Sequence, residues 1–376
     1  MTILHLVQKP QMRGAEIFAA HLANHTSRHG HKVILVSLFP GNSPLPFEGT
    51  MINLGGKPGH RLFNLTAWRR LANIIQQEKP DVIQANAGDT LKYAVFSKLL
   101  FGWKQPIIFR NASTISLYIK TWAARKWNGF LFRHTDKIVS VSKTSADDFA
   151  ALFPQCRDKI TIVPIGIEEV PVQTKQHDAA QNGYGSFPLL VHVGGFTYEK
   201  NHIRLIAIFQ ELLRIYPTAR LHLVGDGPLR SEMEAIVSQK RLDRSIRFLG
   251  ARKDVMELIA GADVLLLPSI IEGLPGVILE AFYCRIPVVA YDVGGVGEVL
   301  INNDTGHLVR KGDENGFVEA ICEVIENRNE EEFLVQNAYQ LVTSGYLNKW
   351  IAKRFIHVYE TVLRHWREVY HIQKTV

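Results

Sequence analysis

Residues 263–292, DVLLLPSIIEGLPGVILEAFYCRIPVVAYD, carry the pattern that decides the fold. Two short apolar runs, at 263–269 and 286–292, enclose a stretch near 275–284 whose apolar residues have helical spacing. Pro275 stands at the start of that stretch, where helices tolerate proline best. A buried strand, a helix and a second buried strand in this order predict one βαβ unit of a parallel sheet.

The same alternation continues on both sides of this unit. In the second half, further strands are expected at 188–196, 219–225 and 246–250, with helices at about 201–216 and 228–240. The first half has strand candidates at 2–7, 32–39, 80–86, 105–111 and 136–142, again separated by helical stretches. The polar segment between the halves, EEVPVQTKQHDAAQNGYGS at 168–186, has no periodicity and is interpreted as a linker.

The length of the chain agrees with two domains. Its 376 residues exceed the ~250 to 300 at which a single hydrophobic core stops growing. We therefore predict an α/β chain with two doubly wound, Rossmann-like parallel sheets, at 1–170 and 187–350, joined by a linker at 171–186. Residues 347–370 have one apolar helical face, which predicts a long final helix. Ligands of such sheets bind outside the carboxyl ends of the strands, so we expect the chemistry in the cleft between the domains.

Composition excludes several classes of protein. Hydrophobic residues make up 46% and charged residues 21%, as in globular chains, and no apolar run is long enough to span a bilayer. Cys156, Cys284 and Cys322 are far apart and form no metal-binding spacing. The first residues, MTILHLVQKP, do not resemble a signal peptide. We expect a cytoplasmic protein without structural disulfides or zinc.

Positive charge is concentrated in the first half. Residues 1–170 contain 21 Lys and Arg against 11 Asp and Glu, whereas the remainder contains 22 against 25. Basic residues alternate with aromatic ones at 61–70, RLFNLTAWRR, and at 117–134, LYIKTWAARKWNGFLFRH. This pattern is typical of helices that lie on an anionic membrane surface, although a core-facing helix with a solvated basic face would have the same sequence. No nucleic-acid-binding motif is present.

The densest candidate site lies at 268–280, PSIIEGLPGVILE, where seven residues separate Glu272 from Glu280. The predicted helix start comprises Gly273, Leu274, Pro275, Gly276 and Val277. Its unpaired backbone N–H groups, which all of these residues except Pro275 possess, suit a pyrophosphate. Glu280, further along the helix, has the two acceptor oxygens that a ribose diol needs.

This segment resembles the Glu-x7-Glu signature of the retaining glycosyltransferases of family 4, which have the GT-B fold of two facing Rossmann-like domains. Other segments agree with that family in order and spacing: VPIGI at 163–167, VGGFTYEKNH at 193–202, LVGDGPLR at 223–230, FLGARKDV at 248–255, DVGGVGEVL at 292–300 and DTGHLV at 304–309. The resemblance covers nearly all of the second half. It also implies that the final helix, at 351–376, returns to the first domain.

The resemblance implies roles for individual residues. Lys200 would bind the donor phosphates and stabilise the charge on the leaving diphosphate, while Glu272 would contact the donor sugar and Glu280 the ribose. The remaining expected donor-binding residues are Gly14, Gly194, Gly195, Asn201, Ala251 and Arg252. No D-x-D motif is present to hold a metal, so we expect a metal-independent enzyme without cofactors.

The sequence departs from the family pattern at several positions. Gly195 stands where the family often has arginine, and Arg13, before Gly14 in PQMRGAE at 10–16, could supply the missing cation. The histidine that often follows a central strand of the first domain is replaced, so that Asn86, Arg110 and Asn111 become the candidates for positioning the acceptor or sugar. Arg110 and Asn111 could equally be strand-end residues with structural hydrogen bonds.

The expected function is transfer of a hexose or N-acetylhexosamine, from UDP-sugar in preference, to a glycan or lipid-linked acceptor in cell-surface polysaccharide synthesis. The basic first domain would then rest on the cytoplasmic membrane face. Two alternatives stay open at this point: a nucleotide-sugar epimerase or hydrolase, and a non-catalytic module that only binds nucleotide sugars.

Overall fold

The computed structural model describes the chain apart from residues 42, 58, 60–62, 172–187 and 376. It divides into two compact units, Met1–Glu168 with Leu347–Val376, and Glu169–Tyr346. The expected linker at 171–186 lies almost entirely outside the described residues. The α/β class and the two Rossmann-like parallel sheets are confirmed.

The first unit is built on a seven-stranded sheet whose described strands are all parallel, in the order β3-β2-β1-β4-β5-β6-β7. The strands are β1 (Thr2–Val7), β2 (Lys32–Ser37), β3 (Met51–Asn53), β4 (Val82–Ala85), β5 (Ile107–Asn111), β6 (Lys137–Ser140) and β7 (Ile160–Ile162). The helices are α1 (Gly14–Arg28), α2 (Leu65–Glu78), α3 (Gly88–Phe101), α4 (Trp122–Arg133) and α5 (Lys143–Leu152), with short 3-10 turns η2 (Ile115–Leu117) and η3 (Pro154–Lys159).

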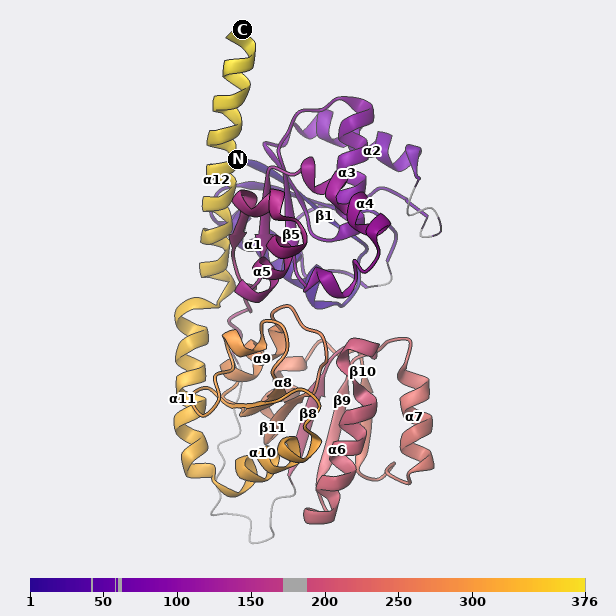
Figure 1. Cartoon of the computed structure of the whole chain (residues 1–376), viewed down its shortest axis with the longest axis vertical. Coiled ribbons are helices and arrows are strands. Elements are labelled where there is room, and N and C mark those ends of the chain that lie inside the picture. The colour runs from indigo at the N-terminus through magenta and orange to yellow at the C-terminus, as the bar shows by residue number, and fades with distance from the viewer. Residues whose placement is uncertain (42, 58, 60–62, 172–187, 376) are drawn as a thin grey trace. The chain divides into compact units, whose positions relative to one another are not determined.

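A helix from the far end of the chain completes the core of the first unit. Helix α12 (Asn348–Thr375) lies alongside α1 (Figure 1), and its Phe355 ring lies 6.1 Å from that of Phe18. The Tyr359 hydroxyl donates to Gln84 Oε1 at 2.6 Å and lies 3.2 Å from His5 Nε2, so the helix is also bonded to β1 and β4. It begins at Asn348, earlier than the expected 351.

The second unit is built on six parallel strands in the order β10-β9-β8-β11-β12-β13. They are β8 (Leu189–Val193), β9 (Arg220–Val224), β10 (Ile246–Gly250), β11 (Val264–Leu267), β12 (Val288–Tyr291) and β13 (His307–Val309). The helices are α6 (His202–Ile215), α7 (Arg230–Gln239), α8 (Val255–Ala260), α9 (Gly276–Tyr283), α10 (Glu314–Glu326) and α11 (Arg328–Gly345), with 3-10 turns η4 (Tyr198–Lys200) and η5 (Val296–Glu298). After β8 the chain moves to one edge of the sheet and after β11 to the other, so the strand order reverses between these two neighbours.

Three strands were not expected from the sequence. Strands β3, β7 and β13 have three residues each and lie at sheet edges, so none of them needs the long apolar run that marks a central strand. The stretch quoted first forms β11, α9 and β12 with little change of boundary, and Pro275 caps α9 rather than entering it.

Candidate donor site

The loops that follow β8 and β11 meet where the strand order of the second sheet reverses. Asn201 Nδ2 donates to the Pro268 carbonyl at 3.0 Å, and Ile270 N donates to the Glu199 carbonyl at 2.8 Å. Asn201 holds a left-handed backbone with φ of 58°, which turns η4 into α6. These contacts join two loops far apart in the sequence at the crevice where doubly wound sheets bind ligands.

Lys200 and Glu272 form an ion pair across these two loops. Lys200 Nζ lies 2.6 Å from Glu272 Oε1, and the side chains are 21% and 10% exposed. Such partial burial keeps the charges from being fully screened while leaving them open to a ligand. An anion that reached this point would compete with Glu272 for the Lys200 ammonium.

Glycines allow the surrounding loops to approach closely. A Cβ on Gly194 would lie 3.1 Å from His192 Nε2 and 3.2 Å from Lys200 Cδ, so the glycine makes room for the lysine stem. Gly294, in the loop after β12, has φ of 55°, and a Cβ there would lie 2.0 Å from the Glu272 carbonyl oxygen. Only glycine fits this contact, so the loop after β12 helps to fix the backbone of Glu272.

Helix α9 presents its amino-terminal end in the same loop. Pro275 is the N-cap, and no residue that the structure describes accepts a hydrogen bond from the N–H of Gly276 or Val277. Gly273, Leu274 and Val277 are buried and fix the course of the loop. The unpaired N–H groups and the helix dipole favour an anion at this point.

Glu280 lies in the second turn of α9 and is largely buried. Burial raises the pKa of its carboxyl to about 7. Within the described part of the chain, the carboxyl oxygens have no hydrogen-bond partner. A carboxylate without donors is costly in such a place, and a ribose diol would supply two of them.

Two buried histidines lie behind Lys200 and stay neutral. Burial lowers the pKa of His192 to about 4, and burial together with the charges of His192 and Lys200 lowers the pKa of His202 to about 2. Their rings meet edge to face at 4.7 Å. Sequence reasoning gave these histidines no role, although both lie in or beside the VGGFTYEKNH segment.

Other expected donor-binding residues are exposed. Gly195 is partly exposed, and its Cβ would lie 3.4 Å from the Asp226 carbonyl. Ala251 is exposed, and Arg252 Nε and Nη2 donate to both carboxyl oxygens of Asp254 at 2.8 and 2.5 Å. Lys311, which sequence reasoning did not select, donates through Nζ to the Ile270 carbonyl at 3.1 Å.

In the first unit, Arg13 and Gly14 lie at the start of α1 with exposed backbone, and a Cβ on Gly14 would meet nothing within 4 Å. Asn86 and Asn111, in contrast, are buried and bonded internally. Asn86 Nδ2 donates to the Leu6 carbonyl at 3.1 Å and its Oδ1 accepts from Gln84, while Asn111 Nδ2 donates to Ser140 Oγ and the Ser145 carbonyl at 3.2 Å each. The structural alternative therefore holds for Asn111, and Asn86 is bonded inside the unit as well.

Arg110 is the unusual member of this group. It is 3% exposed, and its Nε and Nη1 have no hydrogen-bond partner among the described residues. Burial lowers its pKa to about 10, and the guanidinium carbon lies 4.3 Å from the centre of the Phe18 ring. The cation is therefore stabilised by α1 rather than exposed to a ligand.

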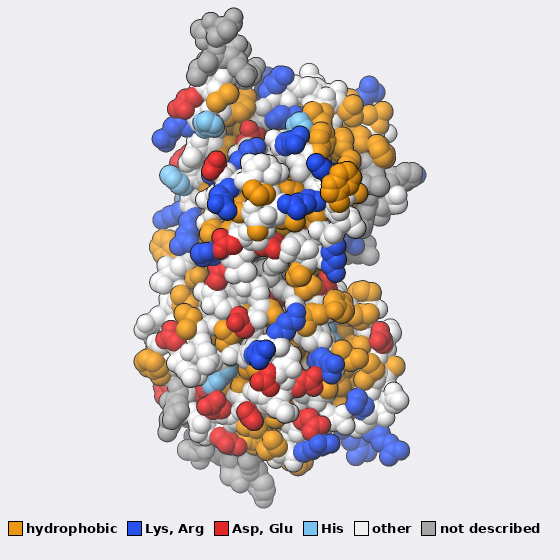
Figure 2. All heavy atoms as spheres, viewed as in Figure 1, with side chains coloured by type: hydrophobic (Ala, Val, Ile, Leu, Met, Phe, Trp, Pro, Cys, Tyr) orange, Lys and Arg blue, Asp and Glu red, His pale blue; other side chains and the backbone are white. Residues whose placement is uncertain are grey.

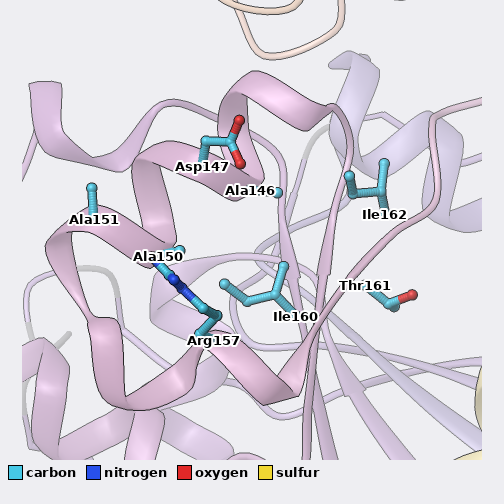
Figure 3. Close-up of a pocket in the computed structure, with 8 residues that line it drawn as sticks. All are labelled: Ala146, Asp147, Ala150, Ala151, Arg157, Ile160, Thr161 and Ile162. Atoms are coloured by element: carbon cyan, nitrogen blue, oxygen red, sulfur yellow. The ribbon is translucent and has the colours of Figure 1, made fainter.

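A hollow of about 680 Å³ lies elsewhere on the first unit (Figure 3). Its lining comes from α5, η3 and β7, and comprises Ala146, Asp147, Ala150, Ala151, Arg157, Ile160, Thr161 and Ile162. None of these is a candidate site residue, and the hollow contains no clustered acid–base groups. In the described residues, no group of three or more metal-ligating side chains is present.

Two family models and several curated proteins match this chain. The family model for glycosyl transferases group 1 matches residues 173–341, and that for glycosyltransferase family 4 matches residues 12–169. N-acetyl-alpha-D-glucosaminyl L-malate synthase of Bacillus anthracis is 23% identical over 94% of this chain and 96% of that enzyme. The amylovoran biosynthesis glycosyltransferase AmsD of Erwinia amylovora is 24% identical over 87% of this chain and 90% of its own length.

Solved structures show the same fold. Anabaena HepE in complex with UDP and glucose superimposes with a TM-score of 0.81 at 18% identity, over 96% of this chain and all of that one. Sucrose-phosphate synthase from Thermosynechococcus elongatus gives 0.82 at 17% identity, over 97% of this chain and 99% of that one.

Proposed function

Since the chain belongs to the glycosyl transferases group 1 family and is a glycosyltransferase that uses nucleotide sugars, we propose that it moves a hexose or N-acetylhexosamine from UDP-sugar to a glycan or lipid-linked acceptor. The matches give no support to the alternatives of an epimerase, a hydrolase or a non-catalytic module. The observation that carries the proposal is the Lys200–Glu272 pair at the reversal point of the second sheet.

Different site residues bind different parts of the donor. Lys200 and the free N–H groups of α9 bind the diphosphate and stabilise the charge that develops as the glycosidic bond breaks. Glu272, released from Lys200, accepts hydrogen bonds from the sugar hydroxyls and so fixes the reacting carbon. Glu280 accepts from the ribose diol. These positive groups supply the stabilisation that a metal supplies elsewhere, so we propose a metal-independent reaction.

We propose a reaction with retention of configuration. With the donor bound, Glu272 accepts from the sugar hydroxyls and Glu280 accepts from the ribose, which leaves neither of these carboxylates as a general base on the opposite face of the sugar. The leaving phosphate can instead take the acceptor proton on the face from which it departs. The new bond then forms on that same face.

The relatives favour a donor and suggest an acceptor class. HepE was solved with UDP and with UDP-glucose, and the malate synthase carries N-acetylglucosaminyl in its name. AmsD is named for biosynthesis of amylovoran. We therefore favour a UDP-sugar and an acceptor of cell-surface polysaccharide synthesis, held by a first unit that works on the cytoplasmic face of an anionic membrane. No helix within the described residues is long and apolar enough to cross a membrane.

Replacement of Glu272 by glutamine tests the proposal. The variant keeps the shape of the side chain but loses its charge, so we expect sugar release or transfer from UDP-sugar to fall by about a hundredfold or more, as when a positioned catalytic group is lost. Glu232→Gln, at an exposed position of α7, is the matched control and should leave turnover unchanged. Equal turnover in wild type and Glu272→Gln would remove Glu272 from the mechanism.

A further inference from the structure

The excess positive charge of the first half comes from two acid-free segments. Residues 49–77 and 90–135 contain 12 Lys and Arg and no Asp or Glu, whereas the rest of residues 1–170 contains 9 against 11. Helix α4 lies wholly within the second segment, which also holds α3 after Asp89, and the first segment holds α2 except Glu78. Asp89 pairs with Lys92 at 2.6 Å, but α4 itself carries cations and no carboxylate, so the surface around it is basic.

Large apolar side chains are exposed on the same helices. Phe63, just before α2, and Trp122, at the start of α4, are each 74% exposed, and Leu100 at the end of α3 is 55% exposed. Trp127 and Phe130 on α4 are more than a third exposed. A soluble monomer rarely leaves so many aromatic and aliphatic groups in water without a use for them.

Ring contacts link Phe63 to Trp127 and Phe130 through Trp68 and Phe96. Phe63 lies 6.3 Å from Trp68, which stacks on Phe96 at 5.1 Å, and Phe96 stacks on Trp127 at 5.6 Å. Phe96 also meets Phe130 at 6.3 Å. We call the exposed part of this surface the aromatic–basic face, formed by Phe63, Leu100, Trp122, Arg125, Lys126, Trp127 and Phe130.

Helix α4 is amphipathic in the way that an interfacial helix requires. Gly129, Leu131 and Phe132 are buried against the unit, while the exposed side carries aromatic and basic residues at helical spacing. Lys126 Nζ lies 5.7 Å from the centre of the Trp122 ring. Figure 2 shows hydrophobic side chains gathered beside lysine and arginine side chains on the first unit.

We propose that the aromatic–basic face docks on an anionic lipid bilayer, with α4 lying in the plane of the interface, a role that rests on the proposed transfer to a membrane-held acceptor. The rings enter the headgroup region and the cations contact lipid phosphates. Charge complementarity selects this occupant, because two copies of a basic face repel each other. The exposed leucines have no counterpart in a stacking surface for nucleic acid.

Vesicle flotation of the full chain tests the docking. We expect binding to vesicles of phosphatidylcholine with about a third phosphatidylglycerol, weak binding to phosphatidylcholine alone, and loss of binding as salt is raised. Arg125→Glu/Lys126→Glu should weaken affinity for the anionic vesicles at least tenfold, since each cation near such a surface contributes about fivefold. Trp122→Ser/Phe130→Ser should weaken it on both kinds of vesicle.

Matched controls use exposed residues of the second unit. Arg244→Glu/Arg247→Glu makes the same change of charge, and Phe333→Ser removes an exposed ring. Controls should bind vesicles as wild type does. The proposal would be overturned if the face variants bound anionic vesicles as well as the controls do. It would also be overturned if wild type did not bind anionic vesicles, and a protein partner would then be the occupant of the face.

The binding of UDP without vesicles separates this proposal from the proposed function. Face variants that fold should bind UDP as wild type does, because the donor residues lie in the second unit. If wild type binds no UDP while vesicle binding follows the expected pattern, the transferase assignment fails and the docking face stands.

Discussion

Replacement of Glu280 by glutamine should stabilise the unliganded protein, and only at high pH. Burial raises the pKa of this carboxyl from 4.5 to about 7 in the folded chain. Between these values the native state binds more protons than the unfolded state, so stability falls as pH rises. The wild type therefore loses about 2.5 kcal/mol between about pH 5 and pH 8 from this group alone.

The variant has no titrating group at this position, so it avoids that loss. The melting temperature of the second unit in the variant, minus that in wild type, should be about 5 to 10 °C greater at about pH 8 than at about pH 5. This comparison removes any constant effect of the amide. Differential scanning calorimetry at both pH values measures this difference. Glu232→Gln, on the exposed side of α7, should shift neither curve. The reasoning would be refuted if the difference between Glu280→Gln and wild type were the same at both pH values.

Three further predictions follow from buried contacts. Gly294→Ala places a Cβ 2.0 Å from a carbonyl oxygen of the loop after β11, so it should destabilise the second unit by at least about 1 kcal/mol and weaken UDP binding, whereas Gly345→Ala should do neither. Burial lowers the pKa of His202 from 6.5 to about 2, so this residue destabilises the folded chain as pH falls through 6.5. Wild type should therefore lose about 2 kcal/mol of unfolding free energy between about pH 7 and pH 5 that His202→Leu does not lose, as measured by calorimetry. Tyr359→Phe leaves Gln84 Oε1 without its donor and should destabilise the first unit by about 1 to 3 kcal/mol in urea unfolding, while an unchanged midpoint would contradict the role given to α12.

The sequence was most informative where local patterns are long. Strands β11 and β12 are continuous buried apolar runs, and the helix between them has apolar residues at helical spacing. Edge strands β3, β7 and β13 were not predicted because three residues make no such pattern.

The geometry of the candidate site could not be predicted from local sequence patterns. Lys200 and Glu272 were selected because they match a family motif, but their 2.6 Å contact joins residues 72 positions apart and depends on the glycines that let three loops converge. Burial is likewise a property of the folded chain. No local pattern could show that Asn86 and Asn111 are bonded inside the first unit or that Glu280 is shielded enough to titrate near neutral pH.

The measurement that tests the central claim most directly is the thermal shift given by UDP, GDP and ADP, with and without EDTA. A ligand that binds only the native state raises the melting temperature by mass action. We predict a shift with UDP that EDTA does not change, that Lys200→Met abolishes, and that Lys240→Met, at the exposed end of α7, retains. No shift with any nucleotide, or an equal shift in wild type and Lys200→Met, would contradict the assignment of the donor site.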